Sequence, residues 1–144
     1  PDGLELLVGD WEYGVEVWDL ATRRQAARLT GHAQLITGVT HILGGDVIVA
    51  SAVDGTILLW DRATGRNLAR LQGDIAGDAL RSIDIAPDGR TLAAGYGDGT
   101  LGLWDLAHCD RHIEGNRDFQ QMLAARAGAP GRDGPEPAGA SPSP

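Results

Sequence analysis

The pair Trp-Asp occurs three times in this chain, at nearly constant spacing. The pairs at Trp18, Trp60 and Trp104 lie 42 and 44 residues apart, and each follows a short apolar run. A glycine lies 15 residues before each Trp, at Gly3, Gly45 and Gly89. A period of this length is the mark of a repeat architecture, in which each unit is one small supersecondary structure that packs against its neighbours.

Within each unit the pattern is typical of β-structure. Asp54-Gly55 and Asp98-Gly99 are dipeptides that accept the positive φ angles of tight hairpins. Short apolar runs rich in Val and Ile lie between these turns. For the second unit the pattern predicts strands near 35–42, 46–52, 56–60 and 67–71, which makes four antiparallel strands per period.

These residues resemble the WD-repeat family of β-propellers. The resemblance rests on Gly31-His32, on the block 54–61 (DGTILLWD) and on its counterpart 98–105 (DGTLGLWD). It implies an all-β segment of four-stranded antiparallel blades over residues 1–115, divided into a partial blade 1–30, a blade 31–72 and a blade 73–115. Propellers need about four to eight blades, so we expect an incomplete ring.

The resemblance also assigns structural roles. In the family a strand Trp, the Asp six residues before it and the Gly-His histidine are joined by hydrogen bonds through a Ser or Thr. In this chain Ala50 occupies the hydroxyl position and Ser51 is one residue off, so we expect that network to be incomplete. The structural positions are Trp18, Asp19, His32, Asp54, Trp60, Asp61, Asp98, Trp104 and Asp105.

By the same resemblance, we expect a non-catalytic scaffold for protein–protein interaction. Its partner-facing positions would be Gln34, Ile36, Val53, Asp78, Leu80 and Gly97. The chain opens on the turn Pro1-Asp2-Gly3, and we expect it to be the C-terminal part of a larger signalling or regulatory protein. The alternative is a set of structural blades that close a propeller whose function lies in an upstream catalytic domain. Upstream sequence or self-association would supply the missing blades.

Composition argues against several other classes. The net charge is −8 and all 12 cations are Arg, so neither a lysine-dependent enzyme nor a nucleic-acid partner is expected. The single Cys109 excludes an internal disulfide. No stretch approaches the ~18 consecutive apolar residues of a membrane helix, and no signal segment opens the chain, so we expect a cytoplasmic protein without membrane contact.

Two chemical motifs have plain structural explanations. The string Gly97–Gly102 fits Gly-x-Gly-x-x-Gly, but it precedes a predicted strand where a dinucleotide site needs a helix, so we expect a hairpin. His108, Cys109 and His112 are too few for a structural zinc site, and we expect a surface turn. Cys109 lacks an organised base, so no catalytic residue, metal or cofactor is predicted.

The C-terminal region departs from the repeat. Residues 116–127 place Phe119, Met122 and Leu123 at helical spacing, which predicts a short amphipathic helix docked on the propeller or on a partner. Residues 128–144 contain five Pro and four Gly and no large apolar residue, so we expect a disordered tail.

Overall fold

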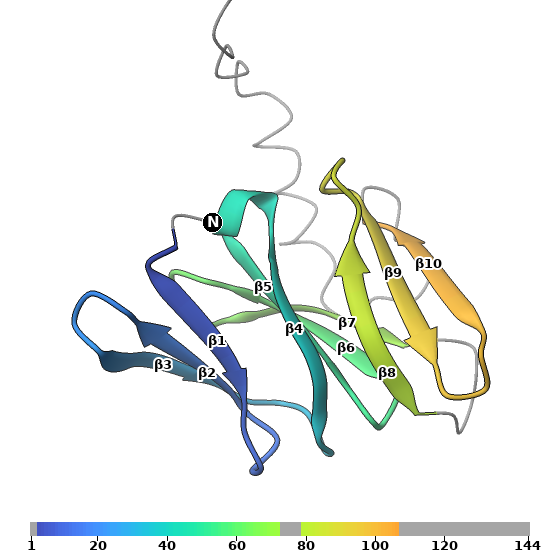
Figure 1. Ribbon diagram of the computed structural model, residues 1–144, viewed down its shortest axis with the longest axis horizontal. Helices are drawn as coiled ribbons and strands as arrows, with labels where there is room; N and C mark the ends of the chain where they lie inside the picture. The colour runs from blue at the N-terminus through green and yellow to red at the C-terminus, as the bar shows by residue number, and fades with distance from the viewer. Residues whose placement is uncertain (1–2, 73–78, 107–144) are drawn as a thin grey trace, which may run out of the picture.

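The computed structural model describes residues 3–72 and 79–106, which form three antiparallel sheets (Figure 1). The strands of the described residues are β1 (Glu5–Gly9), β2 (Val15–Asp19), β3 (Arg24–Leu29), β4 (Ile36–Ile42), β5 (Val47–Ala52), β6 (Thr56–Asp61), β7 (Asn67–Gln72), β8 (Leu80–Ile85), β9 (Thr91–Tyr96) and β10 (Leu101–Asp105). The all-β prediction is confirmed, and the four strands expected in the second unit agree with β4–β7 to within one residue at each end.

Each sheet is a meander in which strands consecutive along the chain are hydrogen-bonded neighbours. The strand orders are β1-β2-β3, β4-β5-β6-β7 and β10-β9-β8. The second sheet lies between the other two, and over the described residues the sheets do not close into a ring (Figure 1). The incomplete ring expected from the sequence is therefore observed.

The core consists of two apolar layers, one on each side of the second sheet. β5 and β6 are buried along almost their whole length because both faces of this sheet are covered. Side chains alternate between the two faces along a strand. Trp60, Ile48 and Leu58 pack with Val15 and Val17 of the first sheet. On the opposite face, alternating residues such as Leu59 and Val49 pack with Leu92 and Ala94 of the third.

The first and second sheets lie close together at Gly9. A Cβ atom at this position would lie 2.7 Å from the Cβ atom of Ile36, which is closer than two carbon atoms can pack. The absence of a side chain at Gly9 therefore allows β1 to lie against the start of β4.

An ion pair also joins these two sheets. The Arg62 guanidinium, just after β6, donates hydrogen bonds of 2.7 and 2.6 Å to the two carboxylate oxygens of Glu5 on β1. The Nε2 atom of His41 lies 3.5 Å from the same carboxylate. The bonds from Arg62 hold the pKa of Glu5 below its ordinary value, so Glu5 stays charged at neutral pH.

Two apolar sheet faces point away from the core. The outer face of the first sheet exposes Leu4, Leu6 and Val8, and that of the third exposes Leu101 and Leu103, both about two thirds exposed. We call these the open faces. Stacked repeats bury such faces against neighbouring units, so the described residues leave two stacking surfaces uncovered.

The expected helix over 116–127 and the tail 128–144 lie outside the described residues, as does the end of the unit 73–115. Within the described ranges the single helical segment is the 3-10 turn η1 (Leu43–Gly45). Over the same ranges no helix has the length and apolarity that crossing a bilayer requires.

Candidate protein-interaction surface

The three hairpins that precede the Trp strands point to the same end of the molecule. Because neighbouring strands are antiparallel, the turns β1–β2, β5–β6 and β9–β10 lie together with the segment that leads into β4 and with Ala79, just before β8. Figure 1 shows the β1–β2 and β9–β10 turns at its lower edge. We call this surface the hairpin end and define it by residues 10–14, 31–35, 53–55 and 97–100.

The turns of the second and third units share one construction. The Oδ1 atom of Asp54 accepts hydrogen bonds from the amide and hydroxyl of Thr56, at 2.9 and 2.6 Å. Asp98 accepts the same two bonds from Thr100, both at 2.7 Å. The residue between them is glycine with φ of +80° at Gly55 and +89° at Gly99. These carboxylates therefore hold the turns, as expected of Asp-Gly hairpins.

Thr56 extends the second turn into the core. Its hydroxyl lies 2.9 Å from Nδ1 of His32, whose ring makes a T-shaped contact with the ring of Trp60, with 5.7 Å between ring centroids. The hydroxyl between His32 and Asp54 thus comes from the turn, whereas Ser51 pairs with Thr37 at 2.9 Å. Burial lowers the pKa of His32. Burial opposes ionisation of Asp54, but the Thr56 bonds hold its pKa below the ordinary value.

The first turn keeps this register with different residues. Trp11 lies seven residues before its repeat Trp, as Val53 and Gly97 do, and Tyr13 takes the place of Gly55 and Gly99. Tyr13 has the same left-handed backbone, with φ of +66°. A bulky residue rarely adopts this conformation, which costs roughly 1–2 kcal/mol.

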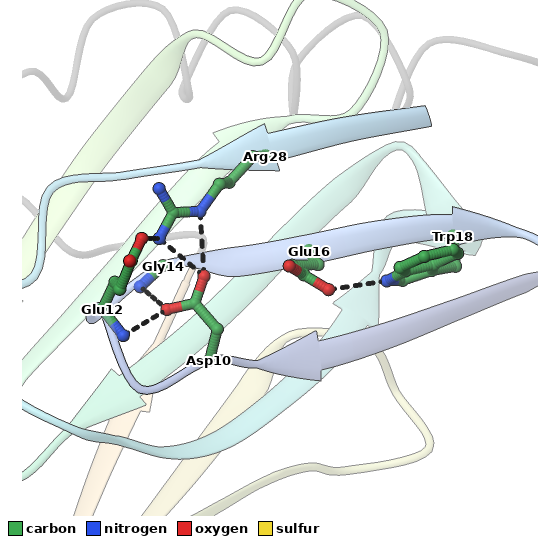
Figure 2. A network of polar contacts seen from close by, with 6 residues as sticks. All are labelled: Asp10, Glu12, Gly14, Glu16, Trp18 and Arg28. Atoms are coloured by element: carbon green, nitrogen blue, oxygen red, sulfur yellow. Dashed lines mark hydrogen bonds and ion pairs between the residues drawn. The ribbon is translucent and has the colours of Figure 1, made fainter. Parts of the chain in front are cut away.

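Asp10 holds this first turn (Figure 2). Its Oδ1 atom accepts hydrogen bonds from the amides of Glu12 and Gly14, at 2.8 and 2.9 Å. Arg28 on β3 donates to Oδ2 of Asp10 and to Glu12, at 2.8 and 2.9 Å. The Gly14 amide and Arg28 keep the pKa of Asp10 below its ordinary value, and Asp10 raises that of Arg28. We call Asp10, Glu12 and Arg28 the turn clamp.

The clamp leaves the aromatic side chains of the turn in solvent. Trp11 is 86% exposed and Tyr13 is 42% exposed. On the adjoining outer face of β2, the indole of Trp18 donates a 2.7 Å hydrogen bond to Glu16 (Figure 2). The hairpin end therefore offers a fixed turn with two accessible aromatic rings.

The predicted partner-facing residues have unequal exposure. Gln34 and Gly97 are exposed, and Val53 and Ile36 are partly buried, with Ile36 packed against the first sheet. Leu80 is fully buried, because it pairs with Tyr96 on the face turned toward the second sheet. The Leu80 side chain therefore has no surface that a partner could contact, and the prediction for this side chain is wrong. Asp78 lies outside the described residues.

The aspartates of the Trp-Asp pairs hold turns at the opposite end. Asp19 accepts a 2.8 Å bond from the amide of Thr22, and Asp61 accepts 2.7 Å bonds from the amide and hydroxyl of Thr64. Trp104 is half-buried beside the second core layer, and Asp105 ends β10. These contacts connect β2 with β3 and β6 with β7, so they stabilise the sheets.

Trp11 and Tyr13 are absent from the sequence-based set of partner-facing residues. The repeat register could have found Trp11, because it is the first-unit equivalent of Val53 and Gly97. Its turn is held by the clamp, in which Asp10 and Arg28 are 18 residues apart and are brought together by the pairing of β2 with β3.

The remaining chemical motifs give no further site within residues 3–72 and 79–106. Gly97–Gly102 forms the β9–β10 turn and the start of β10, so the hairpin prediction is confirmed. Within those ranges no three His, Cys, Asp or Glu side chains are grouped as metal ligands. His108, Cys109 and His112 lie outside them.

The stacked meanders, their hairpin ends and their Trp-Asp pairs define a repeat protein of the β-propeller kind. The chain belongs to the WD40 family, since the family model described as "WD domain, G-beta repeat" matches residues 23–61 and 65–105. Each matched repeat runs from the outer strand of one sheet through three strands of the next, so consecutive repeats share a sheet.

Relatives in other organisms fit this assignment. The chain is 31% identical over 101 residues to "Small ribosomal subunit protein RACK1y" of Oryza sativa subsp. japonica, which covers 70% of this chain and 29% of the relative. It is 30% identical over 104 residues to "Small ribosomal subunit protein RACK1" of Drosophila melanogaster, covering 72% and 31%. The Caenorhabditis elegans protein of that name is 29% identical over 96 residues, covering 67% and 28%. The chain thus spans about three tenths of these relatives.

Proposed function

We propose that this chain is part of a non-catalytic scaffold and binds a protein partner through its hairpin end. The observation that carries the proposal is the common register of three turns, which brings Trp11, Val53 and Gly97 to one end of three stacked sheets. Membership of the WD40 family supports it, because repeat stacks of this kind use such surfaces for binding. An upstream catalytic domain is the alternative, and it makes no use of this surface.

The relatives bear on the kind of assembly involved. By name they are proteins of the small ribosomal subunit. We therefore propose that the protein contact lies within a larger cytoplasmic assembly. The expectation that nucleic acid is absent is not part of this proposal, because a ribosomal subunit contains RNA. We propose further that this chain is part of a larger signalling or regulatory protein.

Site-specific photocrosslinking tests this proposal. A photoreactive amino acid would replace Gln34 at the hairpin end, or Ala63 at the opposite end as the matched control. Proteins crosslinked only from Gln34 are then purified, and their affinity is measured for the wild-type chain, for Q34R/V53D and for A63R. The proposal predicts lost binding for the double variant alone. Equal binding by all three chains would refute it.

We propose in addition that further sheets of the same kind cover the two open faces. Their exposed leucines and valine are the surfaces that stacked repeats bury. Sedimentation velocity on this chain distinguishes the two sources. Dimers or trimers that L6D and L103D each disrupt would mean that a second copy supplies the sheets. A monomer would mean that a longer polypeptide supplies them.

A further inference from the structure

Two residues of the β1–β2 turn are unfavourable for the stability of the folded chain. Trp11 leaves most of its indole in water, although burial of a large apolar side chain stabilises by roughly 1.5–3 kcal/mol. Tyr13 takes a left-handed backbone where the other two units have glycine. Strained backbone and exposed aromatic rings concentrate at binding sites, because there the surrounding structure holds them for a partner.

The turn clamp holds the backbone that carries these rings before any partner arrives. Asp10 ties the turn to itself, and Arg28 ties it to β3 by hydrogen bonds of 2.8 and 2.9 Å to Asp10 and Glu12. A binding loop that is already ordered loses less conformational entropy on association. The geometry therefore favours binding through Trp11 over a purely structural role.

Charge indicates what the turn would bind. The clamp contains two carboxylates and one guanidinium, and so has one excess negative charge. The Glu12 side chain is 81% exposed and lies between Trp11 and Tyr13 in the sequence. The chain as a whole has a net charge of −8. Trp11 and Glu12 are consecutive residues of the turn, and an indole together with a carboxylate suits a guanidinium, which stacks on a ring and donates to carboxylate oxygen atoms.

We propose that the β1–β2 turn docks a basic segment of a partner protein, with an arginine stacked on Trp11 and hydrogen-bonded to Glu12. This inference rests on the proposed function and names the chemistry of the partner. Leucine-like neighbours of that arginine would cover the remaining ring surface of Trp11 and Tyr13.

The test uses the full chain labelled with ¹⁵N and two peptides. One is acetyl-Leu-Arg-Leu-Arg-Leu-amide, and the other has neutral citrulline in place of both arginines. We expect the Trp11 indole N–H and the Glu12 amide to shift on titration with the arginine peptide, and the citrulline peptide to bind at least three-fold more weakly. The signal of Trp11 is assigned by its disappearance in W11A.

Variants distinguish binding at this site from non-specific hydrophobic binding. W11A is expected to weaken binding of the arginine peptide about five-fold, and E12Q to reduce the preference for arginine over citrulline. L103A alters another exposed apolar side chain, on an open face, and should bind like the wild type. Equal binding of both peptides, or unchanged binding by W11A, would overturn the inference.

The two proposals fail in different ways. A partner identified by crosslinking that loses affinity for Q34R/V53D but keeps it for W11A would refute the docking of arginine at Trp11 and leave the scaffold function standing. Arginine-specific peptide binding at Trp11, with no crosslinked partner from Gln34, would refute the broader surface and retain the turn as a site.

Discussion

Replacing Thr56 by valine should test how the second unit is held together. Valine keeps the shape of threonine but removes the hydroxyl that bonds to Asp54 at 2.6 Å and to His32 at 2.9 Å. Thr56 is 2% exposed, so water cannot replace those bonds without opening the core.

The magnitude follows from the groups left behind. A hydrogen bond to a charged group contributes about 1.5–3 kcal/mol, and a buried polar atom left without a partner costs about 1–3 kcal/mol. Asp54 keeps its bond from the Thr56 amide, which limits the loss on that side. We expect T56V to lower the free energy of unfolding by about 2–4 kcal/mol.

Urea denaturation followed by circular dichroism measures this change, with T100V as the matched control. Thr100 makes the same bonds to Asp98, but it is exposed and no histidine in the described residues bonds to its hydroxyl. Water therefore substitutes for the lost hydroxyl, and T100V should lower the free energy by less than half as much as T56V. Equal losses in the two variants would refute the argument that Thr56 links the turn to the core.

Three further predictions concern the ion pair, the histidines and the strained turn. E5Q should lower the free energy of unfolding by about 1 kcal/mol, because the Arg62 side chain is 39% exposed and screened, and 1 M NaCl should shrink the difference from wild type in urea titrations. Burial lowers the pKa values of His32 and His41 in the folded chain, so the unfolded chain binds protons first as the pH falls below about 6.5. Protonation therefore favours unfolding, and the urea midpoint should be lower at pH 5.5 than at pH 7.5. An unchanged midpoint would contradict this. Y13G should raise the unfolding free energy by about 0.5–1 kcal/mol by relieving the left-handed backbone, a gain that a lower midpoint than wild type would disprove.

The sequence by itself determined the repeat and most of the secondary structure. Trp-Asp pairs at nearly constant spacing, with Asp-Gly turns six residues before two of them, predict hairpins because those dipeptides have few alternatives to a tight turn. The predicted strands of the second unit agree with the observed ones to within one residue at each end, since apolar runs between fixed turns leave little freedom in register.

Only the tertiary structure decided which side chains are available to a partner. The resemblance predicted a partner-facing position at Leu80, yet Leu80 is buried because it faces the second sheet. Trp11 is exposed on a turn that Arg28, on another strand, holds through Asp10 and Glu12. Local sequence determines a turn. The exposure of a side chain depends instead on which sheet packs over it, and that sheet is formed by residues distant in the sequence.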